Sequence, residues 1–384
     1  MKTRPLPVPE PRRPLTDTQR LAWLRLIRSE NVGPVTFREI LNHFGGAEQA
    51  LIALPDLSRR GGRGRPIRIC PAGEAERELA AAKKLGVSLA AIDEEGYPPL
   101  LAVIEAPPPL LYIKGRTELL SRPAIAVVGS RDASAAGRKL TQVLAGELGR
   151  EGFVIVSGLA RGIDAAAHVN AMATGTAAVL AGGIDVIYPP ENSDLHREIG
   201  EQGLLIAESA PGLEPRGKDF PRRNRIIAGM SLGVLVVEAA RRSGSRLTAQ
   251  FALEQGRDVF AVPGNPLDPR AEGTNQLIKD GATLVTTAAD ILESLSGILG
   301  SAREPLTARS DLEIPATSTR PIEVDDGERR RVVEALGAAP VTIDDIIRTT
   351  GLDTRHVRAA LIELDLAGRI ERHAGQRVSL RMVA

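Results

Sequence analysis

The chain has 384 residues, of which 43% are hydrophobic and 25% are charged, and its formal net charge is +1. This length suits two or three globular domains, and no uninterrupted apolar run approaches the length of a membrane span. The single cysteine, Cys70, excludes an internal disulfide framework and a multi-cysteine zinc site, so we expect a cytoplasmic protein without a bound metal.

The first segment, residues 1–16, is rich in proline and charge and lacks an apolar signal-peptide core. It is predicted to be a flexible leader. Residues 17–90 are predicted to form a helical domain, because Leu21, Leu24 and Ile27 recur at helical spacing.

Residues 31–36 (NVGPVT) interrupt this pattern, which resumes from residue 37 to residue 44. A helix, a tight Gly-Pro turn and a second helix resemble the helix-hairpin-helix and SAM-like modules, whose turn can offer backbone N–H groups to a nucleic-acid phosphate. A helical packing domain is the alternative. The basic segment 59–68 is predicted to be a loop.

Between residues 91 and 296, apolar runs rich in β-formers alternate with helical stretches. The runs are almost continuously apolar, which is typical of strands covered on both faces, and their spacing leaves room for crossover helices. We therefore predict an α/β domain with a Rossmann-like, doubly wound parallel sheet. The predicted strands are 125–128, 153–157, 177–180, 204–207, 234–237, 259–262 and 283–285. The segment from Tyr97 to Gly115 is predicted to add a strand or two at the sheet edge.

Residues 297–326 lose periodicity and collect Pro, Ser, Thr and charge, which indicates a linker. In residues 327–384, three helical stretches precede a hairpin that turns at Gly375, a pattern typical of a winged helix-turn-helix. Arg355 and Arg358 in the third stretch suit DNA-groove reading, but this domain has ten Arg against eight acidic residues. A duplex-DNA regulator, a protein-contact module and a merely appended domain therefore all stay open.

The sequence FPRRNRIIAG begins at Phe220, between two predicted strands and at the predicted start of a helix. It places Arg222, Arg223 and Arg225 beside Asn224, and the ten residues that end at Arg225 hold five Lys or Arg against one Asp. Helix N-terminal N–H groups favour an anion, and each guanidinium can hold phosphate oxygens in a bidentate way. The segment predicts a phosphate site, with a solvated basic patch as the alternative.

Gly-rich or polar turns also follow the other predicted strands, and ligands of such sheets bind outside the carboxyl ends of the strands. These turns contain no GxGxxG fingerprint and no Walker loop, so neither NAD nor ATP is expected as a cofactor. We predict that the turns converge on one groove for a polyanion. The candidate nucleic-acid-binding residues are Gly129, Ser130, Arg131, Gly158, Arg161, Gly162, Asn192, Phe220, Arg222, Arg223, Asn224, Arg225, Ser243, Gly244, Ser245, Arg246, Thr248, Asn265 and Asn275.

The order and spacing of these motifs closely resemble the DprA (Smf) family of DNA-processing proteins. The motifs are VGSR, SGLARGIDAAAH, YPPEN, FPRRNRIIAG, SGSRLTAQFALEQGR, VFAVPGNP and GTNQLIKDGA. The resemblance spans residues 95–295, and the SAM-like and winged-helix segments complete the family's three-part arrangement. It implies a protein of natural transformation that binds incoming single-stranded DNA, protects it from nucleases and helps to load RecA onto it. It also implies a homodimer formed through the Rossmann-like domain and a basic DNA pocket that includes Arg131.

Some members of the family carry a basic, DNA-binding residue where this chain has Pro190, and Arg161 or the arginines after Phe220 could compensate. Aromatic residues make up only 3% of the chain, and core packing competes with base stacking for Tyr188, Phe220 and Phe260. We therefore expect binding through phosphates and backbone donors, with little sequence preference. If about five phosphates are neutralised, log affinity should fall with log salt with a slope of roughly −3.5.

A nucleotide-processing hydrolase of the lysine-decarboxylase-like Rossmann group is the competing prediction. The PGGxGTxxE loop of those enzymes is not present, because VPGN and GTN stand apart in this chain. We expect Asp164 to fix its Gly-rich turn, His168 to be packed, and Glu238 to orient Arg223 or Arg225. No residue is therefore predicted to be catalytic.

Overall fold

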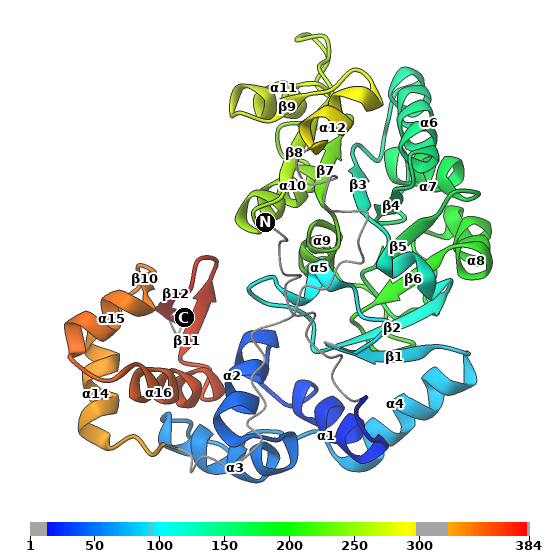
Figure 1. Ribbon diagram of the computed structural model, residues 1–384. Helices are drawn as coiled ribbons and strands as arrows, with labels where there is room; N and C mark the ends of the chain where they lie inside the picture. The colour runs from blue at the N-terminus through cyan, green and yellow to red at the C-terminus, as the bar shows by residue number, and fades with distance from the viewer. Residues whose placement is uncertain (1–13, 93, 297–321, 382–384) are drawn as a thin grey trace, which may run out of the picture. The chain divides into compact units, whose positions relative to one another are not determined.

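The computed structural model describes residues 14–92, 94–296 and 322–381 (Figure 1). Residues 1–13 of the predicted leader and residues 297–321 of the predicted linker lie outside the described residues. Contacts divide the chain into two compact units. Among the described residues, the sheet unit holds Pro14, 81–92, 94–104 and 110–296, and the flanking unit holds 15–80, 105–109 and 322–381.

The sheet unit is built on nine strands in the order β1-β2-β6-β5-β4-β3-β7-β8-β9. Strands β3 to β9 all run parallel to one another. Strand β2 pairs antiparallel with β6, and β1 pairs antiparallel with β2. Their bounds are β1 Ser88–Ala91, β2 Leu110–Gly115, β3 Ala124–Val128, β4 Val154–Ser157, β5 Thr176–Leu180, β6 Leu204–Ala207, β7 Gly233–Val236, β8 Asp258–Ala261 and β9 Thr283–Leu284. The predicted α/β fold and its seven parallel strands are confirmed, and the segment from Tyr97 to Gly115 adds one strand, β2, beside β6. Sequence reasoning missed β1, a short strand that is exposed at its first residue.

Apolar side chains fill both faces of the central strands, and β3, β4, β5 and β6 are buried along their whole length. Figure 1 shows α6, α7 and α8 on one side of the sheet and α9 and α10 on the other, as right-handed crossovers require when the strand order reverses. The helices of this unit are α5 Pro99–Ala102, α6 Ala135–Arg150, α7 Ile163–Ala171, α8 Ser193–Gln202, α9 Asp219–Gly229, α10 Gly244–Glu254, α11 Glu272–Lys279 and α12 Ala288–Ser294, with short 3-10 turns η1 Thr117–Ser121 and η2 Pro190–Asn192.

The flanking unit combines an N-terminal helical module with a C-terminal winged helix. The helical module, as we use the term, is α1 Asp17–Ile27, α2 Pro34–Phe44 and α3 Ala47–Arg60; α4 Ala72–Lys84 follows it. The hairpin of two helices is confirmed, although α2 begins at Pro34, because proline suits the first position of a helix. Helix α3 runs to Arg60, so the first two residues of the predicted loop are helical.

The winged helix has three helices and a three-stranded sheet in the order β10-β12-β11. Its elements are α14 Asp326–Ala335, β10 Val341–Thr342, α15 Ile343–Thr350, α16 Thr354–Leu366, β11 Ile370–His373 and β12 Arg377–Leu380. This arrangement confirms the predicted winged helix. In the part of the chain that the structure describes, no helix is long and apolar enough to cross a membrane.

Candidate nucleic-acid interface

A pocket of about 290 Å³ lies where the turns after β3, β4 and β5 meet helix α9. Arg131 comes from the turn after β3, and Gly158 and Arg161 come from the turn after β4. Phe220 and Arg223 reach it from α9. Of the turns that sequence reasoning expected to converge, this pocket gathers those that follow β3 to β6.

Arg223 lies beneath this pocket and is only 6% exposed. Its Nη1 donates to the carbonyl oxygen of Gly158 at 2.6 Å and to that of Val179. Burial lowers the pKa of Arg223 to about 10, which leaves it cationic at neutral pH. Because its Nη1 donates to carbonyls at the ends of β4 and β5, Arg223 braces the pocket floor.

Asp164 fixes the turn after β4, as predicted. Its Oδ2 accepts hydrogen bonds from the backbone N–H of Gly158 at 3.1 Å and of Ala160 at 3.3 Å. Burial raises the pKa of Asp164, although the charge of nearby Arg223 opposes this shift. His168 is fully buried, and its Nδ1 lies 2.7 Å from the hydroxyl of Thr176, so the prediction that it is packed is also confirmed.

Arg222 and Arg225 share one counterion, Glu208, which directly follows β6. The Nη2 atoms of Arg222 and Arg225 donate to Glu208 Oε1 at 3.0 and 2.7 Å. Although burial alone would raise it, these two guanidiniums hold the pKa of Glu208 below its usual value. The side chain of Arg225 is 12% exposed and that of Arg222 is 50% exposed, so Arg222 is the more available of the two to a ligand. Sequence reasoning missed Glu208, and its position directly after a predicted strand was the available signal.

The prediction that Glu238 orients Arg223 or Arg225 is wrong. Glu238 instead accepts hydrogen bonds from Ser134, with the backbone N–H at 2.9 Å and the hydroxyl at 2.5 Å. Ser134 is the N-cap of α6, and β3 and β7 are neighbours at the point where the strand order reverses. Doubly wound sheets bind nucleotide phosphates at such a point, against a helix N-terminus. Here a carboxylate of the chain occupies that position, which disfavours a nucleotide-processing enzyme.

Several other predicted residues shape the turns around the pocket. Asn192 Nδ2 donates to the carbonyl oxygens of Leu159 and Ala160 at 2.9 and 3.2 Å. Gly162 has a φ of 76°, and a Cβ there would lie 2.3 Å from the carbonyl oxygen of Ser130, so only glycine lets the first two turns meet. The Ser130 hydroxyl accepts a hydrogen bond from the backbone N–H of Asp132, and Gly129 packs on Ile163.

The remaining predicted residues do not line the pocket. They lie in the turns after β7 and β8 and in helices α10 and α11, and they are Ser243, Gly244, Ser245, Arg246, Thr248, Asn265 and Asn275. Asn275 bonds both the N–H and the carbonyl of Gly264, and Asn224 Nδ2 donates to Gly244 O at 3.2 Å. These side chains hold loops and helix ends together.

Two aromatic rings line the pocket. The rings of Tyr188 and Phe220 lie 5.3 Å apart, and the Arg131 guanidinium carbon lies 5.5 Å from the centre of the Phe220 ring. Tyr188 is 46% exposed, whereas Phe260 is fully buried in the core. The structure therefore answers the question that the sequence left open for these three rings. Tyr188 and Phe220 line the pocket, whereas Phe260 belongs to the core.

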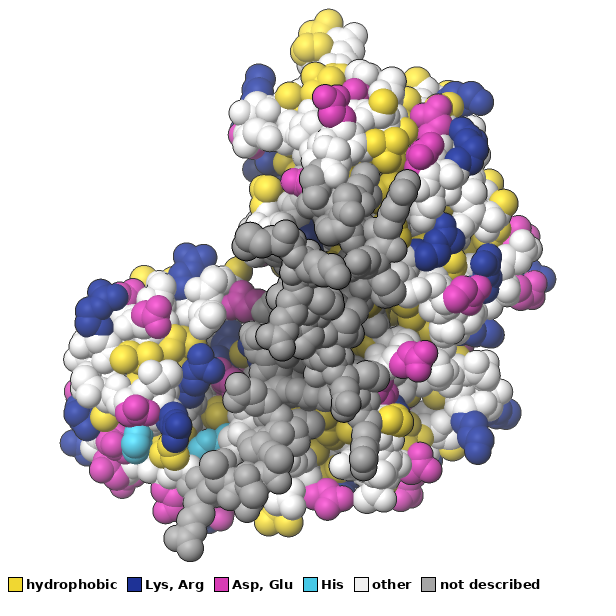
Figure 2. All heavy atoms as spheres, in the orientation of Figure 1, with side chains coloured by type: hydrophobic (Ala, Val, Ile, Leu, Met, Phe, Trp, Pro, Cys, Tyr) yellow, Lys and Arg dark blue, Asp and Glu magenta, His cyan; other side chains and the backbone are white. Residues whose placement is uncertain are grey.

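Charge around the pocket is modest. Pro190 lines it, and Arg161 lies there too, 3.8 Å from carboxylate oxygens of both Asp132 and Glu191. Figure 2 shows cationic and anionic side chains interspersed over the face in view, in keeping with the formal net charge of +1. Among the residues that the structure describes, no group of three or more His, Cys, Asp or Glu is arranged for a metal ion.

Three family models match the chain. The model described as DNA recombination-mediator protein A matches residues 88–296, the DprA-like N-terminal HHH domain matches residues 17–81, and the DprA winged helix domain matches residues 316–376. Protein Smf of Synechocystis sp. is 32% identical over 398 residues, covering 96% of this chain and 100% of that protein.

Two solved structures are also similar. The X-ray structure of DNA processing protein A from Streptococcus pneumoniae is 37% identical with a TM-score of 0.61, covering 72% of this chain and 98% of that one. The DNA processing protein A structure from Helicobacter pylori, whose title describes a single-stranded DNA binding mode, is 30% identical with a TM-score of 0.51, covering 55% of this chain and 96% of that one.

Proposed function

The chain belongs to the DNA recombination-mediator protein A (DprA/Smf) family, and on that premise we propose that it binds single-stranded DNA in the pocket beside α9. The observation that supports this proposal most is that cations and aromatic rings line one pocket. Arg131 and Arg161 stand beside Tyr188 and Phe220 there. Guanidiniums suit phosphate oxygens, and aromatic faces stack on any base, so the pocket suits a single strand of any sequence.

In this proposal, Arg131 and Arg161 contact phosphates, and Arg222 adds a third cation at the rim. Arg161 also takes the place of the basic residue that some relatives carry at the position of Pro190. A duplex hides its base faces in the stack, so Tyr188 and Phe220 favour a single strand over a duplex.

Fluorescence anisotropy with a labelled oligothymidine and a duplex of equal length tests the proposal. We expect tighter binding of the single strand and a loss of roughly 10- to 100-fold in Arg131→Ala, because a hydrogen bond to a charged group contributes about 1.5–3 kcal/mol. Arg150→Ala is the matched control, since Arg150 is exposed at the end of α6 and does not line the pocket. Equal affinity for both DNAs, or equal loss in both variants, would contradict the proposal.

We further propose that the bound strand is incoming DNA during natural transformation, that binding protects it from nucleases in the cytoplasm, and that the protein helps to load RecA onto it. Membership of a recombination-mediator family supports this role. The test is ATP hydrolysis by RecA on DNA already covered with single-strand-binding protein. Adding the wild-type chain should shorten the lag, and adding Arg131→Ala should not. An unchanged lag with wild type would refute the loading role.

A homodimer through the sheet unit is the third part of the proposal. Within the described residues, β9 pairs only with β8, and its Leu284 is 48% exposed at the edge of the sheet. An exposed strand edge that carries an apolar side chain suits pairing with a second copy. Light scattering after gel filtration should give a dimer for wild type and a monomer for Leu284→Glu. A dimer that survives this substitution would place the interface elsewhere.

A further inference from the structure

The winged helix packs on the helical module through α16, the helix that enters the major groove when such a domain reads DNA. One face of α16 packs into the domain's own core through Val357 and Leu364. The opposite face carries Arg355, Ile362 and Leu366 at helical spacing. This outward face of α16 is the one that a DNA groove would receive.

The helical module covers the second half of the outward face. Ile362 and Leu366 are 3% and 0% exposed, although neither belongs to the core cluster of the winged helix. The carbonyl oxygen of Leu366 accepts hydrogen bonds from Asn31 Nδ2 at 3.0 Å and from the Ser58 hydroxyl at 3.4 Å. Arg355 remains exposed in the first turn of α16. The groove-reading face is therefore divided between a covered apolar half and a free cationic half.

A carboxylate of α16 also covers the hairpin turn of the helical module. The hydroxyl of Thr36, in the first turn of α2, donates to Asp365 Oδ2 at 2.6 Å. Arg372 donates to the same oxygen at 2.7 Å and forms two hydrogen bonds with Glu39 of α2. All three charged side chains are at most 16% exposed, and the two carboxylates raise the pKa of Arg372 although burial opposes this. Asp365 thus lies where the hairpin turn would hold a nucleic-acid phosphate.

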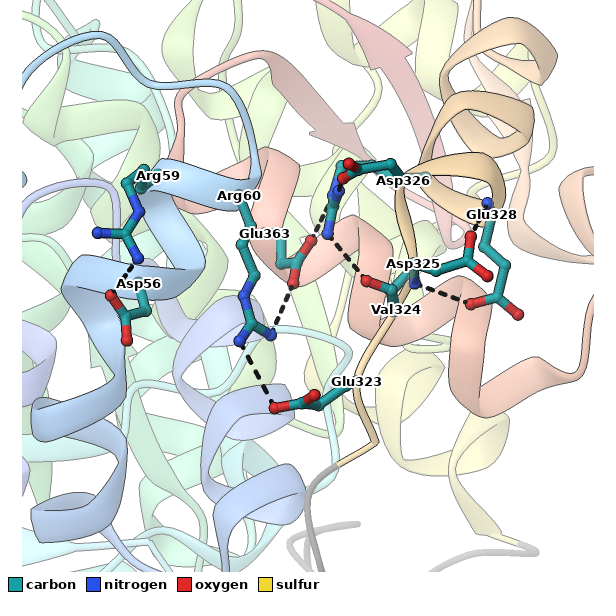
Figure 3. Close-up of polar contacts among 10 residues, drawn as sticks. Asp56, Arg59, Arg60, Glu323, Val324, Asp325, Asp326, Glu328 and Glu363 are labelled. Carbon is teal, nitrogen blue, oxygen red and sulfur yellow. Dashed lines mark hydrogen bonds and ion pairs between the residues drawn. The ribbon is translucent and has the colours of Figure 1, made fainter.

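A second contact fixes the end of α3 against α16. Figure 3 shows Arg60 reaching toward both Glu323 and Glu363, at 3.5 and 4.0 Å. Glu363 Oε2 also accepts from Arg329 Nε at 2.6 Å. Next to this network, a Cβ on Gly61 would lie 1.9 Å from the carbonyl oxygen of Glu363. Since Gly61 has a φ of −66°, any residue could adopt its backbone conformation, and only the closeness of α16 requires glycine.

We propose that the helical module and the winged helix mask each other's DNA-binding surfaces, and that the winged helix has a duplex-DNA site on the outward face of α16. While the two are docked, the outward face cannot enter a groove, and Asp365 occupies the phosphate position of the hairpin turn. The interface includes the ion pairs of Arg60 with Glu323 and Glu363 and of Arg372 with Glu39. Interfaces between domains of one chain are commonly transient. A phosphate backbone competes with Asp365 for the turn and with Glu363 and Glu39 for the arginines, so duplex DNA favours the undocked state.

The substitution Gly61→Ala tests the proposal because its methyl group collides with α16 and changes no charge. Gly64→Ala is the matched control, since a Cβ on Gly64 meets no atom within 4 Å. Docking is measured by energy transfer between dyes on Ile52→Cys and Glu334→Cys, both exposed, in the Cys70→Ser background. Binding of a short blunt duplex is measured in the Arg131→Ala background, which removes the pocket from the comparison.

Gly61→Ala should lower the energy transfer and tighten duplex binding. If about one molecule in ten is undocked in the wild type, full undocking tightens binding roughly tenfold. Adding Arg355→Ala should abolish this gain, and Gly64→Ala should change neither quantity. Lower energy transfer without tighter binding would overturn the duplex site, and unchanged energy transfer would overturn the masking.

A second variant decides the question if circular dichroism shows that Gly61→Ala does not fold. Asp365→Asn removes the carboxylate from the hairpin turn and from Arg372, and it keeps the size of the side chain. Asp344→Asn makes the same charge change at an exposed site on α15. The proposal requires Asp365→Asn to tighten duplex binding at least several-fold more than Asp344→Asn does. Equal effects of the two variants would overturn it.

Discussion

The salt dependence of single-stranded DNA binding distinguishes a groove lined with arginines from the pocket seen in the structure. The sequence suggested about five neutralised phosphates and a slope of roughly −3.5. Of the predicted arginines, however, Arg223 is bonded to backbone carbonyls and Arg225 is buried against Glu208. Arg131, Arg161 and Arg222 keep exposed guanidiniums. Three contacts at about 0.7 each give a slope of roughly −2 for a single strand.

Between 50 and 200 mM salt, a slope of about −2 weakens binding roughly 16-fold, whereas a slope of about −3.5 weakens it roughly 130-fold. Anisotropy titrations with an oligothymidine short enough for one protomer, at four or more salt concentrations, separate these values. Arg131→Ala should make the slope shallower by about 0.7, and Arg150→Ala should leave it unchanged. A wild-type slope of −3.5 or steeper would refute this reasoning, because it would require phosphate contacts from cations outside the pocket.

Three further substitutions test the supports of the pocket. Glu208→Gln removes the shared counterion of Arg222 and Arg225, so single-stranded DNA should bind several-fold more tightly in anisotropy titrations; weaker binding would show that Glu208 mainly positions the arginines. Gly158→Ala places a Cβ 2.4 Å from the Arg223 guanidinium and should cost about 1–3 kcal/mol in urea denaturation, whereas Gly217→Ala, whose Cβ meets no atom within 4 Å, should cost less than about 0.5 kcal/mol. Burial lowers the pKa of His168 to about 3, so the unfolded chain takes up a proton below pH 6.5 that the folded chain does not. Stability is therefore lost as the pH falls, by about 2 kcal/mol between pH 7.5 and 5, and His168→Gln should abolish that part of the loss; an unchanged pH dependence in the variant would exclude His168 as its source.

Local sequence patterns predicted most of the elements of this fold. Continuous apolar runs predicted the parallel strands, since a strand buried on both faces is apolar along nearly its whole length. The periodicity of the C-terminal segment likewise predicted the three helices of the winged helix. The short strand β1 (Ser88–Ala91) escaped because four residues with one exposed end carry almost no periodic signal.

The partners of the charged residues could not be predicted in the same way. Arg225 meets Glu208 from 17 residues away, and Thr36 meets Asp365 from 329 residues away. Such pairs depend on which turns the strand order brings together, which no local pattern encodes. The sequence predicted a polyanion site, and the structure shows fewer free arginines among the predicted residues than that prediction assumed.

The small number of available cations limits how tightly one pocket can bind a DNA strand. A pocket with three available cations and two rings provides few contacts, and part of the charge of Arg161 is offset by Asp132 and Glu191. A single protomer should consequently bind a strand only modestly and release it readily at physiological salt. A dimer offers two such pockets to one strand, and linked sites of this kind can gain 10²- to 10⁴-fold in avidity without any new contact. The proposed homodimer and the proposed single-stranded DNA binding are therefore connected. If each pocket offers only a few free charges, stable coverage of a strand requires the second pocket, and the proposed loading role requires each pocket to release the strand to a recombinase.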